Sequence, residues 1–223
     1  MMPNRQKNRA ASATRSLAGV TVPDTLLVAE SISYAKEHSE PFLFNHVMRS
    51  WLFAAALAEA HNTVHDSEVL AIAAILHDLG LATAFQGSRR FEVEGANAAR
   101  EFALDMGVDE DRAQLVWDGV AFNSTPSLAL YKQPEVALCT AGTLVDWSGQ
   151  GATSLNEEQV AAILEAYPRL DMKARFSNAI CGIVKTRPET TYDNFARDFG
   201  ERYVPDYKAP STVDYLLNSP FSE

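Results

Sequence analysis

The chain has 223 residues, which is enough for one well-cored domain with extensions, so a second full domain is not required. Its 19 Lys and Arg residues against 29 Asp and Glu give a net charge of -10, which repels nucleic-acid backbones and excludes nucleic acid as an expected partner. No window approaches the roughly 18 uncharged apolar residues of a membrane span, so we expect no membrane partner either.

The N-terminal segment and the cysteines bear on location. Residues 1–20 are basic, and no apolar stretch of the kind that a secretory signal needs follows them. We predict a disordered tail there, with a transit peptide as the alternative. Cys139 and Cys181 show no paired spacing and fit buried thiols of a reducing compartment, so we expect a cytoplasmic protein.

Apolar residues recur at helical spacing almost throughout, whereas the alternating β-branched runs typical of strands are nearly absent. The sequence therefore predicts an all-α fold, with one helical domain over residues 21–205 and an irregular tail at 206–223. The loop that best divides the domain is expected at 149–156. The predicted helices, in chain order, are 24–37, 39–61, 66–78, 91–106, 109–123, 134–147, 157–167, 171–185 and 191–202.

The helix predicted over 66–78 carries signals at both ends. Asp66 is a suitable N-cap, and Glu68 places a negative charge in the first turn. Gly80 stands where a left-handed residue ends a helix. The helix is therefore expected to stop at the pair His77 and Asp78.

That pair belongs to a set of ionisable residues on apolar helix faces. His77 continues a buried stripe at i, i+3, i+4 and i+7, and His46 shares an inward face with apolar neighbours on the preceding helix. Asp146 lies in the last turn of the helix at 134–147. Taken singly, each is more often a hydrogen-bonded core residue or a solvated carboxylate. Together with Asp78, these side chains on separate helices can close around one divalent cation.

The order His, His-Asp, Asp resembles the pattern of the HD-domain metal-dependent hydrolases. Among these hydrolases, the chain is similar to the cyanamide hydratase family in particular. The similarity runs from about Phe42 to Gly149 and lies in four segments: FNHVMR, LHDLGLAT, SRRFEVEGANAAREF and PEVALCTAGTLVDWSG. The resemblance implies a single HD-domain helical bundle with a metal site between helices. It implies Zn²⁺ as the metal, with Fe²⁺ or Mn²⁺ as alternatives, and four ligands: His46, His77, Asp78 and Asp146.

One position departs from that family. Where the resembling proteins have a histidine followed by Thr, this chain has Asn123, and an amide cannot act as an acid or base near neutral pH. Any proton transfer that the histidine performs in the resembling proteins is therefore absent here or is performed by another residue. Asn123 is expected to hydrogen-bond the substrate instead.

The resemblance implies a hydratase that adds metal-activated water to a small nitrile-type substrate, converting cyanamide to urea. Asp78 is expected to ligate the ion and to orient the water. Arg49, one turn beyond His46, is expected at the rim of the site, and Arg89 is expected to contact substrate; a surface role is an equal alternative for both arginines. Aromatic residues such as Trp147 are assigned to the core.

Two other functions remain open at this point. Many HD proteins hydrolyse phosphate monoesters, often of nucleotides, and Arg49 and Arg89 would then hold phosphate. A noncatalytic metal or small-ligand binding module is the third hypothesis, because of Asn123. The apolar residues at 160–164 and 179–184 could build a homo-oligomer face or complete the core.

Overall fold

The computed structural model describes residues 13–221. Helices make up most of this part of the chain, which confirms the predicted all-α fold. The elements, in chain order, are β1 (Thr14–Leu17), β2 (Val20–Pro23), α1 (Leu26–His38), α2 (Pro41–Ala60), α3 (Ser67–Leu76), α4 (Phe91–Asp105), α5 (Glu110–Phe122), α6 (Pro126–Ala129), α7 (Pro134–Ser148), α8 (Glu157–Ala166), α9 (Met172–Thr186), α10 (Ala196–Tyr203) and α11 (Thr212–Leu217).

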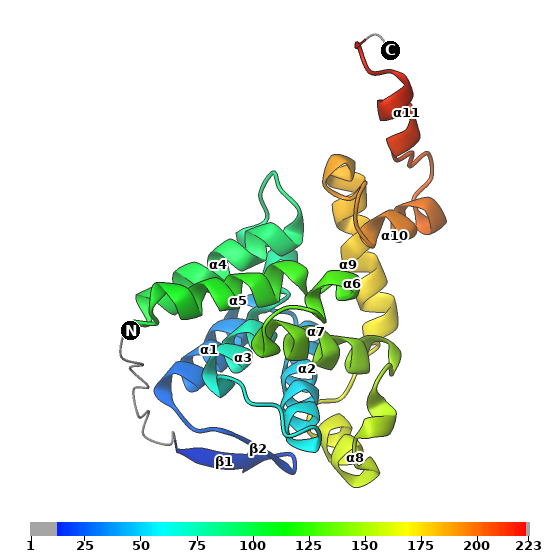
Figure 1. Cartoon of the computed structure of the whole chain (residues 1–223). Helices are drawn as coiled ribbons and strands as arrows, with labels where there is room; N and C mark the ends of the chain where they lie inside the picture. Colours follow the sequence, from blue (N-terminus) through cyan, green and yellow to red (C-terminus); the bar gives the residue numbers. More distant parts are fainter. Residues whose placement is uncertain (1–12, 222–223) are drawn as a thin grey trace, which may run out of the picture.

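Helices α2, α3 and α7 form the centre of the molecule, as Figure 1 shows. Helix α3 is buried along its whole length after the first turn, and most of α2 is buried as well. Helices α4 and α5 pack against each other and cover α3, while α9 packs against α2. Because α2 and α3 are both covered by other helices, polar residues on their facing sides lie in a shared interior.

Close packing of α2 against α7 depends on Gly142. A Cβ atom added at Gly142 would lie 2.2 Å from the backbone oxygen of Ser50, a distance that real Cβ atoms do not adopt. The missing side chain lets the two backbones approach, as small residues do at tight helix contacts. This contact fixes α7 against the helix that carries His46.

Helix α3 begins and ends close to the predicted residues. The Asp66 side chain accepts hydrogen bonds from the backbone N–H groups of Glu68 and Val69, and the helix ends at Leu76. Gly80 was predicted to end the helix in a left-handed conformation, and this is wrong, because Gly80 is not among the glycines with positive φ in the described chain. It is required because an added Cβ would lie 1.8 Å from the carbonyl oxygen of Phe91, so the turn packs directly on the start of α4.

Both ends of the chain differ from the sequence predictions. Residues 14–23 form an antiparallel hairpin, so the predicted disordered tail is wrong for residues 14–20; residues 1–12 of that tail lie outside the described residues. At the other end, α11 forms a short helix inside the tail expected to be irregular. Figure 1 shows α11 projecting away from the other helices.

Helix α6 was not predicted, and a single 3₁₀ turn lies within the loop predicted at 149–156. Within residues 13–221, no helix has both the length and the apolar character that crossing a membrane requires.

Candidate metal centre

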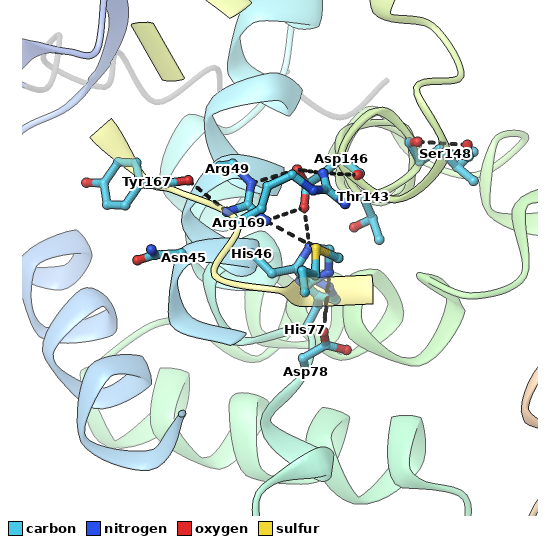
Figure 2. A network of polar contacts seen from close by, with 12 residues as sticks. Asn45, His46, Arg49, His77, Asp78, Thr143, Asp146, Ser148, Tyr167 and Arg169 are labelled. Carbon is cyan, nitrogen blue, oxygen red and sulfur yellow. Dashed lines mark hydrogen bonds and ion pairs between the residues drawn. The ribbon is translucent and has the colours of Figure 1, made fainter. Parts of the chain in front are cut away.

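Three side chains meet in the interior between α2 and the end of α3. His46 comes from α2, and His77 and Asp78 directly follow α3. The Nε2 atoms of His46 and His77 are 3.2 Å apart, and Asp78 Oδ2 lies 3.4 and 3.3 Å from them. All three residues are at most 3 % exposed. They form the metal-binding cluster, whose neighbours are drawn in Figure 2.

The second nitrogen of each imidazole is held by a hydrogen-bond acceptor. His77 Nδ1 lies 2.8 Å from the carbonyl oxygen of Ala74, and His46 Nδ1 lies 2.6 Å from Asp146 Oδ2. Each Nδ1 atom therefore carries a hydrogen and donates it, which leaves the Nε2 lone pair directed into the cluster. Ligand histidines in metal sites are oriented in this way.

The spacing of the three ligand atoms fits a divalent ion. Ligands at about 2.0–2.1 Å from a tetrahedral ion lie about 3.3 Å from one another, as these three atoms do. Asp78 Oδ2 also has no hydrogen-bond partner among the described residues, although it is buried. A buried carboxylate oxygen without a donor is costly, and a cation would satisfy it. The residues present therefore fit a bound metal.

The pKa shifts in the cluster follow from burial and from the charges that its members place on one another. Burial lowers the pKa of His46 and so favours the neutral imidazole that binds metals. Burial also acts to lower the pKa of His77, but the charge and contact of Asp78, together with the hydrogen bond to the carbonyl oxygen of Ala74, outweigh burial, so the pKa of His77 is raised. The pKa of Asp78 is lowered in turn, because the two imidazoles outweigh the effect of burial. Metal binding would favour the neutral form of both imidazoles, because their Nε2 lone pairs would then be donated to the cation.

Asp146, the fourth predicted ligand, lies on the far side of the His46 ring from the cluster. Its carboxylate accepts from Arg49 Nε at 2.7 Å and Nη2 at 2.8 Å, and from Arg169 Nη1 at 3.0 Å. Burial acts to raise the pKa of Asp146, but hydrogen bonds from His46 and Arg49 hold it well below its usual range. In this structure Asp146 holds His46 through this hydrogen bond and does not belong to the cluster, and its role as a fourth ligand stays a prediction.

Arg49 is completely buried, so the prediction that it reaches the rim of the site was wrong. Its remaining terminal nitrogen, Nη1, donates to the backbone carbonyls of Tyr167 and Pro168, at 2.8 and 3.2 Å. Figure 2 shows the guanidinium between Asp146 and the chain at Tyr167. Arg49 therefore supports the site from behind His46.

A pocket of about 180 Å³ opens beside the cluster. Asn123 lines it, and its Nδ2 donates to the carbonyl oxygen of Val120 at 2.6 Å. Its hydrogen bond to a substrate stays a prediction. Arg89 does not line it and is exposed, so the structure does not bring Arg89 to the predicted position. Besides the cluster and Asn123, the lining residues are Phe91, Ser124, Pro126, Thr143, Leu144, Trp147, Phe176 and Phe195.

Several of these lining residues were missed or misassigned from the sequence. Trp147, assigned to the core, is 41 % exposed at the pocket. Thr143 stands three residues before Asp146 on α7, and this helical spacing is the signal that could have found it. Phe176 and Phe195 come from segments far along the chain, and no local pattern indicates their position.

Cys139, close to the cluster on α7, is not among the described residues whose ligand atoms converge there. Burial, together with the negative charge of Asp78, raises the pKa of the Cys139 thiol to about 12. The protonated thiol lies 3.6 Å from the carbonyl oxygen of Gly119. The residues whose ligand atoms converge are two histidines and an aspartate, so the cluster consists of imidazole and carboxylate groups.

A helical domain with a buried His-His-Asp cluster beside a pocket is the arrangement of a metal-dependent enzyme. Residues 43–146 match the family model described as HD domain, which covers slightly less than half of the chain and includes the cluster and Asp146. This region of the chain is therefore similar to HD domains. No curated protein matched the chain.

Proposed function

We propose that this protein is a metal-dependent hydratase that adds water to the carbon of a small, uncharged nitrile-type group. Cyanamide, which becomes urea, is the first substrate to try. The four sequence segments similar to the cyanamide hydratase family support this proposal, and so does the chemistry of the pocket. We also propose a cytoplasmic location, because Cys139 and Cys181 are buried free thiols that fit a reducing compartment.

His46, His77 and Asp78 would hold the metal, with zinc proposed first and iron or manganese as alternatives. When bound, such an ion lowers the pKa of a coordinated water toward about 7 and polarises the substrate. The protein's own contribution is to orient both imidazoles through their Nδ1 atoms and to keep the site enclosed. Asp78 Oδ1 is left to orient a water, since Oδ2 faces the imidazoles.

The observation that carries the proposal is the polarity of the uncharged lining groups. Ser124 Oγ donates to Glu92 Oε1 at 2.7 Å, and Thr143 Oγ1 donates to the carbonyl oxygen of Cys139 at 3.0 Å. The amide nitrogen of Asn123 is likewise committed to a backbone carbonyl. These three groups therefore offer acceptors to the pocket, which suit a neutral molecule with N–H groups.

The same polarity argues against the alternative, a phosphohydrolase acting on nucleotides or other phosphate monoesters. Phosphate oxygens accept hydrogen bonds and are bound by Arg, Lys or backbone N–H groups. No Lys or Arg is among the described residues that line the pocket. Arg49, which would serve as the phosphate anchor, is already committed to Asp146 and two backbone carbonyls.

The test is metal content by mass spectrometry, followed in the same preparation by assays with cyanamide, other small nitriles and nucleoside monophosphates. We expect one tightly held ion per chain and formation of urea from cyanamide or of amide from a nitrile. Release of phosphate without nitrile hydration would establish the phosphohydrolase instead. Tight metal binding with no turnover of any of these compounds would establish a noncatalytic binding module.

A further inference from the structure

The pocket is larger than cyanamide needs. Its volume is about 180 Å³, whereas an apolar protein cavity of about 150 Å³ is known to accept benzene. A molecule with only a few heavy atoms would leave most of the pocket to disordered water. The size therefore indicates a substrate with a ring-sized body beyond the reacting group.

Aromatic rings line the way from the cluster to the surface. Phe176 packs edge-to-face against the His46 imidazole, with ring centres 5.8 Å apart, and against Trp147 at 4.7 Å. Trp147 contacts Phe195 at 6.1 Å, and Phe195 contacts Phe91 at 5.9 Å, again edge-to-face. These four aromatic residues, which we call the aromatic wall, come from α4, α7, α9 and the residue before α10.

The pocket outside the cluster carries no formal charge. Arg90, on the loop before α4, pairs with Glu92 at 2.9 Å, and neither residue lines the pocket. An ionised body would lose its hydration there without gaining a partner. A flat, uncharged ring would instead bury its surface against aromatic faces and edges, the contact geometry that aromatic groups prefer.

We propose that the aromatic wall is an aryl-binding subsite, and that the substrate is an aryl cyanamide or aryl nitrile whose nitrile carbon lies at the cluster. The substrate class rests on the proposed function, but the subsite itself does not. In the reaction, the carbon–nitrogen triple bond becomes a single bond, and the nitrile carbon gains a double bond to the water oxygen. Both O–H bonds of the water break, and both protons move to the nitrogen. The product is an aryl urea or aryl amide, and no oxidant is needed.

The experiment compares binding of phenylurea and urea by isothermal titration calorimetry, with metal-free and zinc-loaded protein. Burying a phenyl ring gives roughly a 10- to 100-fold gain in affinity, so phenylurea should bind that much more tightly than urea in both forms. Phe195→Ala should remove most of this preference while leaving the weak binding of urea unchanged. Trp147→Ala, at a partly exposed position, is the second variant if Phe195→Ala fails to fold.

Tyr215→Ala is the matched control, because Tyr215 is an aromatic residue of the projecting helix α11 and is 66 % exposed. It should keep the wild-type preference. Equal affinities for phenylurea and urea would overturn the aryl subsite, even if nitriles are hydrated. Tight phenylurea binding that depends on the aromatic wall, without hydration of any nitrile, would support the subsite and overturn the proposed function.

Discussion

Two groups of buried polar residues meet at His46 and differ in how they are satisfied. On one side, the metal-binding cluster brings two imidazoles to a carboxylate oxygen that has no hydrogen-bond partner in the described chain. On the other side, both oxygens of Asp146 accept hydrogen bonds from Arg49. Buried polar groups are normally paired, so the unsatisfied side indicates where a ligand belongs and the satisfied side supports it.

The two sides should respond to mutation in opposite ways. A side chain that awaits a cation can lose its charge without harming the apo fold, whereas a member of a completed ion pair cannot. Mutations on the cluster side of His46 should therefore mainly affect metal binding, and mutations on the Asp146 side should mainly affect the free energy of unfolding.

The largest effect is expected from Asp78→Asn. The change removes the anionic ligand, so the protein should retain no metal and show no activity, while the apo protein unfolds at the same or a higher urea concentration. Metal content by mass spectrometry and urea unfolding followed by circular dichroism measure the two parts. Asp105→Asn, at an exposed carboxylate on α4, is the control. A full metal content in Asp78→Asn would show that the cluster is not the metal site.

Arg49→Leu should have the largest effect on stability. It leaves the Asp146 carboxylate buried without its two-point partner, which typically costs about 3–5 kcal/mol of unfolding free energy. Urea unfolding of the metal-free protein gives this value directly. The double variant Arg49→Leu with Asp146→Leu should recover part of the loss, because no buried charge is then left unpaired. A cost below about 1 kcal/mol would mean that the pair does not stabilise the fold.

The residues of the cluster could be predicted from the sequence better than the residues that surround it, for a physical reason. The start of α3 and the inward face of His46 follow from local signals, the capping carboxylate of Asp66 and helical periodicity. The depth of Arg49 could not be predicted, because it depends on the backbone carbonyls of Tyr167 and Pro168, more than a hundred residues away. The same limit applies to Phe195, which reaches the pocket only through the packing of the C-terminal helices.

Asp146→Asn distinguishes the two roles open to this residue. If Asp146 orients His46, as its 2.6 Å contact with Nδ1 indicates, the variant should still bind one metal ion, with about 10- to 100-fold lower affinity. Competition with a chromophoric chelator measures this change. Complete loss of binding, as in Asp78→Asn, would instead make Asp146 a ligand, the role implied by the family resemblance.

The smallest effect is expected from Arg169→Ala. Arg169 also binds Asp146, donating to its backbone oxygen at 2.8 Å and to Oδ1 at 3.0 Å, but its side chain is 35 % exposed. Water screens and replaces such a contact, so the loss in unfolding free energy should be about 1 kcal/mol or less. Metal affinity should remain close to that of the wild type, because Arg49 alone keeps the carboxylate in place. If Arg169→Ala weakened metal binding as strongly as Asp146→Asn, the exposed arginine rather than the buried one would be holding Asp146 against His46, and the contrast between the two sides of His46 would need to be redrawn.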